Sequence, residues 1–224
     1  MEWVFKLLRE TPSLDPLLRP THWYIATGER DSSYRYVAFD DKGPTAAALA
    51  AIRDDNTGST AVQSFSLWNG EEDHTRGASI TCLFNQQDGR SSSLSIRLRS
   101  EPDGFRLEST ANCIKLLLDV VQIYKPLYCA FCPGQYDSVF PDRPPVGWMI
   151  YLPRVLTVKQ VPEARALVSV LGKDERGKDK QTGTIVVSVT DKPFSDQNSD
   201  HVKLANAIEI RLVDQDLLPR FADL

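Results

Sequence analysis

The chain has 224 residues, of which 42% are hydrophobic and 25% charged, and its formal net charge at pH 7 is −4. This composition is typical of a globular protein and excludes collagen-like, disordered and membrane-spanning classes. The acidic balance argues against a dedicated nucleic-acid binder, which needs a surplus of Lys and Arg. A chain of this length can bury a sizeable core, so we expect one domain over residues 1–224 that needs neither disulfides nor a structural metal.

The first predicted element is a short helix at residues 1–10, in which Trp3, Val4, Leu7 and Leu8 share one side. The segment lacks the charged stretch, apolar run and cleavage site of a secretion signal, and no apolar run in the sequence approaches the ~20 residues that span a bilayer. The four cysteines are few for the length and lie within apolar segments. We therefore expect a cytoplasmic protein.

The next predicted elements lead into a hairpin and a second helix. Prolines interrupt residues 14–20, which predicts an extended connector. Aromatic and β-branched residues at 22–27 and 34–39 flank a polar segment, and this pattern indicates a β-hairpin. An alanine-rich helix is predicted at 45–53, with Pro44 near its first turn.

Three alternating segments then predict an antiparallel meander with one solvent-exposed face. Polar and apolar residues alternate along 61–68, 78–84 and 93–98, with the period of two that is typical of half-buried strands. The joins carry Asn-Gly at 69–70 and Asp-Gly at 88–89, and both pairs favour tight turns.

The clearest predicted helix covers residues 107–124 and ends before Pro126. Its apolar stripe at helical spacing consists of Leu107, Ala111, Ile114, Leu118 and Val121. A last helix is predicted at 200–214. Its inward side consists of Ala205, Ile208 and Leu212.

Four strands are predicted between these two helices, at residues 127–131, 147–152, 166–171 and 184–190. A proline-rich loop at 133–145 separates the first two strands, and a charged stretch at 172–181 separates the last two. Strands therefore come in runs interrupted by helices, without strict βαβ alternation. This order favours an α+β fold with a largely antiparallel sheet flanked by helices.

A CxxC pair, Cys129 and Cys132, is the first candidate for chemistry. In redox enzymes such a pair opens a helix whose N-terminus lowers the thiol pKa, whereas this pair closes an apolar strand. A zinc site would need two further ligands, and Cys82 and Cys113 stand alone in other elements. Buried structural thiols are the favoured interpretation, and a metal site or a thiol enzyme stays open.

The three histidines, His22, His74 and His201, belong to no metal-ligand or catalytic motif. The sequence also lacks a nucleophile elbow, a phosphate-binding loop and a dinucleotide fingerprint. We therefore predict a protein that is not an enzyme, needs no cofactor or metal, and acts by binding another protein rather than nucleic acid, a membrane or a small molecule.

Carboxylates cluster in the predicted turns and helix ends. The clusters are residues 40–41, 54–55, 71–73, and 101 with 103. Most such clusters are solvated loop charges, and the alternative is that one or two face a basic cleft on a partner, where charged rims speed association. Glu71, Glu72 and Asp73 form the densest cluster, and we predict that they bind the partner.

Aromatic residues supply the other half of a predicted interface, because Trp and Tyr are favoured at binding hot spots. Tyr136 and Phe140 lie in the proline-rich loop, where exposure is expected. Trp148 follows this loop, and its candidate roles are partner binding and core packing. Trp68 is a further candidate for either role.

The stretch from 113 to 157 resembles the Immunity protein 52 family of bacterial polymorphic-toxin systems. The similarity is greatest over 126–153, above all in the segment VGWMIYLP at 146–153. The resemblance implies an immunity protein that binds and neutralises a restriction-endonuclease-like nuclease toxin; some such toxins are delivered by type VI secretion. It implies no catalytic residues. An effector-loading adaptor or chaperone and a CxxC thiol enzyme stay open as alternatives.

Overall fold

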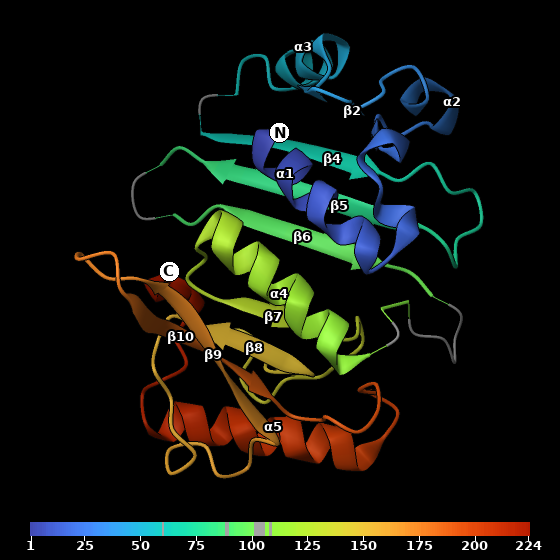
Figure 1. Cartoon of the computed structure of the whole chain (residues 1–224). Helices are drawn as coiled ribbons and strands as arrows, with labels where there is room; N and C mark the ends of the chain where they lie inside the picture. The colour runs from blue at the N-terminus through green and yellow to red at the C-terminus, as the bar shows by residue number, and fades with distance from the viewer. Residues whose placement is uncertain (60, 88–89, 101–105, 108) are drawn as a thin grey trace. The chain divides into compact units, whose positions relative to one another are not determined.

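The chain forms two compact units, Met1–Glu108 and Ser109–Leu224, each with its own sheet and helices (Figure 1). The residues that the computed structural model describes are 1–59, 61–87, 90–100, 106–107 and 109–224. The predicted turn at 88–89 and the acidic residues Glu101 and Asp103 lie outside the described residues.

The first unit combines three α-helices with short strands and a four-stranded sheet. Its elements are α1 (Glu2–Glu10), η1 (Thr11–Ser13), η2 (Pro16–Leu18), η3 (Pro20–His22), β1 (Tyr24–Ile25), α2 (Arg30–Ser33), β2 (Phe39–Asp40), β3 (Gly43–Pro44), α3 (Ala46–Asp55), β4 (Val62–Trp68), β5 (Ala78–Asn85) and β6 (Ser93–Leu98). The Thr45 hydroxyl caps α3 by accepting from the Ala48 amide. The predicted alanine-rich helix and the three strands of the meander are confirmed.

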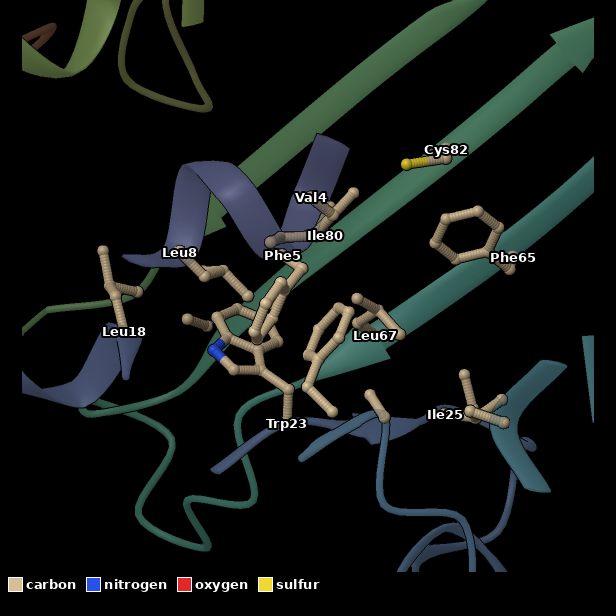
Figure 2. Packing of buried hydrophobic residues seen from close by; sticks show 14 residues of the cluster. Val4, Phe5, Leu8, Leu18, Trp23, Ile25, Phe65, Leu67, Ile80 and Cys82 are labelled. Carbon is tan, nitrogen blue, oxygen red and sulfur yellow. The ribbon is translucent and has the colours of Figure 1, made fainter. Parts of the chain in front are cut away.

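The sheet of the first unit is antiparallel, with strand order β1-β4-β5-β6. Its register places Leu67 opposite Ile80 and Ile80 opposite Ile96, so these side chains share one face. Val4 and Phe5 of α1 pack on this face and close the core (Figure 2). The other face is polar and exposes such residues as Thr81 and Arg97 of β5 and β6, which confirms the predicted solvent-exposed face.

Two predictions for the first unit were wrong. Residues 14–20 do not form an extended connector, because Pro12, Pro16 and Pro20 each stand in the first turn of a short 3-10 helix, where proline is favoured. In α1, Phe5 is buried instead of Trp3, whose side chain is 60% exposed.

The predicted hairpin at 22–39 is partly confirmed. The Ile25 amide donates to the Tyr36 carbonyl at 2.9 Å, and the Ala38 amide donates to the Trp23 carbonyl at 2.8 Å, so the two segments run side by side. The connection between them is helical, since residues 30–33 form α2. Strand β1 then pairs with β4 and thereby joins the main sheet.

The second unit has a four-stranded antiparallel sheet of order β7-β8-β10-β9. Its elements are α4 (Thr110–Tyr124), β7 (Cys129–Phe131), β8 (Met149–Leu152), β9 (Ala166–Lys173), β10 (Asp179–Val187), α5 (Ser199–Asp214) and η4 (Phe221–Asp223). All four residues of β8 are buried, so both faces of the sheet are covered at this strand. Ile208 and Leu212 of α5 pack with Ile150 and Val186, and α4 contacts β7 (Figure 1).

The inward side predicted for α5 is confirmed, because Ala205, Ile208 and Leu212 are buried. The stripe predicted for α4 was wrong, apart from Val121. The buried residues of this helix are Cys113, Leu116, Leu117, Val120 and Val121. Leu107 is buried but precedes the helix, whose N-cap is Ser109.

The charged stretch at 172–181 is not a separate loop, because it forms the end of the β9–β10 hairpin. The Asp174 carboxylate accepts from the amides of Arg176 and Lys178, and Gly177 has a φ of +74°, so the tight turn stabilises itself. Most of the charged side chains of this stretch thus lie in the turn between the two paired strands.

All strand pairs of the described residues are antiparallel, and the α+β class is confirmed. The organisation of residues 1–224 as a single domain stays a prediction. None of the helices in the described part of the chain combines the length and apolarity that crossing a membrane requires.

Candidate partner-binding site

The predicted acidic residues lie in the turn between β4 and β5, which we call the acidic turn (69–77). Asn69, which is 2% exposed, fixes the ends of this turn. Its side-chain oxygen accepts from the Ala78 amide at 2.7 Å, and its amide nitrogen donates to the Arg76 carbonyl at 3.2 Å. Gly70 has a φ of +74°, which favours glycine. The backbone of the turn therefore has a preset shape.

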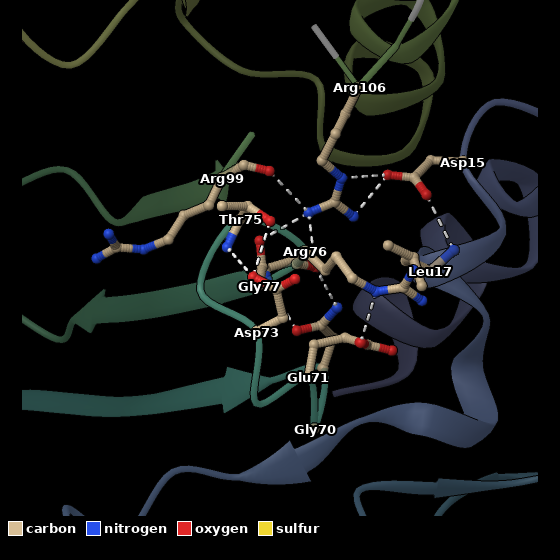
Figure 3. Close-up of polar contacts among 12 residues, drawn as sticks. Asp15, Leu17, Gly70, Glu71, Asp73, Thr75, Arg76, Gly77, Arg99 and Arg106 are labelled. Atoms are coloured by element: carbon tan, nitrogen blue, oxygen red, sulfur yellow. Dashed lines mark hydrogen bonds and ion pairs between the residues drawn. The ribbon is translucent and has the colours of Figure 1, made fainter. Parts of the chain in front are cut away.

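An ion pair between Arg106 and Asp15 anchors the base of the acidic turn (Figure 3). Their side chains are 11% and 5% exposed, and the guanidinium approaches the carboxylate at 2.6 Å. Arg106 also donates to the carbonyls of Gly77 at 2.7 Å and Arg76 at 3.0 Å. The other Asp15 oxygen accepts from the Leu17 amide, so one buried pair joins the turn to η2.

The three acids of the turn are largely occupied by neighbours within the chain. Two of them pair with arginines, as Glu71–Arg76 at 3.0 Å and Glu72–Arg30 at 3.8 Å. The hydroxyl and then the amide of Thr75 donate to Asp73 and lower the pKa of its carboxyl. The turn is exposed, as predicted, but its charge is more nearly balanced than the sequence indicates.

An aromatic cluster of Tyr24, Tyr34 and Trp68 lies beside the acidic turn. The Tyr34 ring stands 5.1 Å from Tyr24 and 5.3 Å from Trp68, centroid to centroid. Its hydroxyl donates to the Gly70 carbonyl at 3.2 Å, and the residue is 37% exposed. Sequence analysis missed Tyr24 and Tyr34 as members of this surface. The sequence offered one signal for this cluster. Aromatic residues stand in both strands of the predicted hairpin and also directly before the turn.

In the second unit, Tyr136 lies in the proline-rich loop, but its hydroxyl points into the protein. It donates to the carboxylate of Glu209 at 2.8 Å and contacts the Asn206 amide oxygen at 2.8 Å. Burial, and then the Glu209 charge, raise the pKa of Tyr136. The ring packs edge-on against Phe194, with centroids 5.7 Å apart. Tyr136 is therefore half-buried, and only part of its ring is accessible.

Glu209 is 1% exposed, although it is the kind of residue that usually faces solvent. One carboxylate oxygen accepts from Tyr136 and from the Val146 amide at 2.9 Å, and the other accepts from the Val139 amide at 2.8 Å. Sequence analysis missed this residue. The signal was its position in α5 directly after Ile208, on the side of the helix that the apolar stripe buries.

Phe140 and Trp148 occupy different environments. Phe140 is half-buried within the loop. Trp148 is 1% exposed, and its indole nitrogen donates to the Val189 carbonyl at 2.8 Å. Its ring meets Phe131 edge-on, at 5.8 Å between centroids. Trp148 is a core residue in this structure and presents no surface to a partner, which corrects the prediction that it is a contact residue.

Burial holds the thiols in their protonated form. It raises the pKa of Cys129 to about 12 and that of Cys132 above its ordinary value, where the Glu209 charge adds to the shift. Burial likewise raises the pKa of Cys82 to about 11 and that of Cys113 to about 12. A thiol enzyme needs a lowered thiol pKa, because the thiolate is the nucleophile.

The histidines stand in separate places, with His22 and His74 exposed and His201 buried. Within the described ranges, no three or more His, Cys, Asp or Glu side chains are grouped so that they could hold a metal ion. Two surface segments with a hydrogen-bonded shape, the acidic turn and the proline-rich loop, lie one in each unit.

A family model described as Immunity protein 52 matches residues 2–220, so the chain belongs to this family. The match extends over both compact units. It makes the protein an immunity protein, which implies a toxin as its partner. No curated protein shows a significant match to the chain.

Proposed function

We propose that the protein neutralises a restriction-endonuclease-like nuclease toxin by stoichiometric binding in the cytoplasm. The observation that carries this proposal is the family match over residues 2–220. The resemblance at 126–153 supports the nuclease class of the toxin and its delivery by type VI secretion. In this account the immunity protein is not an enzyme and uses no cofactor.

Neutralisation requires that almost no free toxin remains, which corresponds to a nanomolar Kd or a binding free energy of about −12 kcal/mol. A standard interface of roughly 1,600 Å² can supply this affinity if its contacts are well placed. Preset loops help, because a segment that is already ordered loses less conformational entropy on binding. Asn69 and Arg106 preset one such segment, and Glu209 presets the other.

The contacts that we propose are Glu71, Glu72 and Asp73 of the acidic turn, together with Phe140 and the exposed edge of Tyr136. The aromatic cluster beside the turn adds rigid apolar area of the kind that forms hot spots. Nucleases carry basic surfaces toward DNA, and exposed carboxylates are complementary to such surfaces. Trp148 supports β8 from the core and is not among these contacts.

A titration of DNA cleavage tests the proposal. The toxin encoded beside this protein would be assayed on plasmid DNA with increasing amounts of the purified immunity protein. We expect cleavage to fall in proportion to the added protein and to cease near a fixed molar ratio. Undiminished cleavage in the presence of excess, correctly folded protein would contradict the proposal.

Two controls separate this function from its alternatives. An effector-loading adaptor would bind outside the nuclease domain and would leave cleavage by the isolated domain unchanged. A thiol enzyme would lose its effect when Cys129 and Cys132 are both replaced by Ser. We expect this double variant to inhibit normally, because the burial of both thiols disfavours their reactive form.

A further inference from the structure

The proline-rich loop (133–145) and Val146, which follows it, form one segment, loop 133–146, whose shape is fixed by one buried carboxylate. Glu209 accepts hydrogen bonds from the Tyr136 hydroxyl near the start of the loop, from the Val139 amide in its middle and from the Val146 amide at its end. A further bond joins the Phe221 amide to the Asp142 carbonyl at 2.9 Å. Hydrogen bonds thus hold the loop in place along its length.

Core stability alone does not explain this use of Glu209. Removing a carboxylate from water is costly, and a well-packed apolar residue at such a position is often at least as stabilising. No ion pair to Glu209 occurs within the described part of the chain, and its hydrogen bonds go to the loop. What the carboxylate adds is a single conformation for a surface segment that has no helix or strand.

The surface of this loop has an apolar centre with an acidic residue on either side. Val139 is 38% exposed, Pro141 is also exposed, and Phe140 between them is half-buried. Asp137 and Asp142 are exposed on either side of this centre. Asp142 has only a loose ion pair with Arg220, at 3.9 Å and well exposed, which leaves its charge available to a partner.

We infer that loop 133–146 is a preformed contact surface for the toxin, complementary to a protein face on which basic side chains surround an apolar recess. Glu209 acts as its positioning residue and does not touch the partner. This inference rests on the proposed function and names the surface that performs it. The match in charge is with a DNA-binding face, which is basic because it must neutralise phosphates.

Substitutions of exposed loop residues test the contact. Val139→Lys and Asp137→Lys each place a positive charge opposite the basic side chains that we expect on the toxin. Binding of the toxin encoded beside this protein would be measured by surface plasmon resonance, and each variant is expected to weaken it on the order of tenfold or more. The matched control is Val158→Lys, since Val158 is a valine of the same unit that is 70% exposed. This control is expected to bind within about twofold of the wild type.

Glu209→Gln tests the positioning role. A glutamine side chain has only one acceptor oxygen, so at least one of the amides of Val139 and Val146 loses its bond. We expect faster hydrogen exchange at these amides and weaker toxin binding, with the far-UV circular dichroism unchanged. Should this variant fail to fold, Tyr136→Phe removes one of the three bonds and provides the same two measurements.

The outcomes are distinct. Absence of binding by the wild-type protein would refute the proposed function itself. Normal binding by the wild type and by both Val139→Lys and Asp137→Lys would overturn the contact surface, and so would an equal loss in Val158→Lys. A loosened loop with unchanged affinity would overturn the positioning role of Glu209.

Discussion

The acidic turn of the first unit and Glu209 of the second unit use carboxylates in opposite ways. Glu71, Glu72 and Asp73 are adjacent, accessible and balanced by nearby arginines and Thr75. Glu209 is a lone carboxylate inside the unit, and three donors depend on it. The comparison teaches that burial, more than the density of charge in the sequence, decides how much a carboxylate contributes to structure.

The same contrast exists beneath the acidic turn. Its acids Glu72 and Asp73 are exposed and Glu71 is partly so, whereas the ion pair that anchors its base, Arg106–Asp15, is almost fully buried. Each unit therefore has a polar anchor inside and a surface segment outside that the anchor shapes. We expect substitutions at the anchors to change stability most, with binding affected through the segment they shape, and substitutions on the segments to change binding alone.

The largest effect is expected from Glu209→Ala. The amides of Val139 and Val146 would lose their acceptor, and the Tyr136 hydroxyl would keep only Asn206 as an acceptor, which together should cost about 3–5 kcal/mol of unfolding free energy. Urea denaturation would measure the loss. The dependence of the unfolding free energy on urea concentration would be compared between variants, because the two units need not unfold together. A loss below about 1 kcal/mol would show that water replaces the carboxylate easily.

A somewhat smaller effect is expected from Asp15→Ala in the first unit. The variant leaves the Arg106 guanidinium without its carboxylate, but Arg106 keeps its bonds to the carbonyls of Arg76 and Gly77. We predict a loss of about 2–4 kcal/mol, measured by the same denaturation. A double variant with Arg106→Met should recover part of this loss. No recovery would indicate that Asp15 acts mainly through the Leu17 amide.

Stability should also depend on pH through His201. Burial, and then the charge of Lys192, lower the pKa of His201 below its ordinary value of 6.5, although Asp191 and Asp200 oppose the shift. Because the folded protein resists protonation more than the unfolded chain, the stability from neutral His201 is fully present above the unfolded pKa. It is lost as the pH falls from about 6.5 toward the folded pKa.

His201→Asn isolates this contribution. The asparagine oxygen can still accept from the Ser195 amide, which donates to His201 Nδ1 at 3.0 Å, but the side chain does not titrate. We expect the Tm of the wild type to fall more than that of the variant between about pH 7 and pH 5.5. Parallel Tm profiles would show that His201 does not titrate in this range.

The smallest effect on stability is expected from reversing Glu71, Glu72 and Asp73 to Lys. Exposed ion pairs contribute little, so the unfolding free energy should change by less than about 1 kcal/mol. Association with the toxin should slow and become less sensitive to salt. Stopped-flow association rates over a salt series would measure this, and unchanged rates would remove the turn from the interface.

Local patterns predicted the elements whose residues interact mainly with sequence neighbours. The period of two located β4, β5 and β6, and helical spacing located α5 with its buried side. The prediction of the buried face of α4 was wrong because several apolar residues of this helix lie outside the stripe that is buried. Spacing alone allowed more than one stripe. The fold class follows from the order of elements and was predictable.

The anchors of the site could not be predicted, because they join distant parts of the chain. Asp15 and Arg106 stand 91 positions apart, and Val139 and Glu209 stand 70 apart. The sequence located the exposed turn correctly but could not show that Arg30 and Arg76 balance it. It also could not separate Trp148, which is core, from Phe140, which is half-exposed.

The central claim is that this protein acts by remaining bound to a toxin. The most direct measurement is the survival of cells that express the cognate toxin, with and without the immunity protein. Our account predicts full survival with the wild type and with the variant in which Cys129 and Cys132 are replaced by Ser, and reduced survival with Val139→Lys. Cell death despite abundant, folded wild-type protein would contradict it.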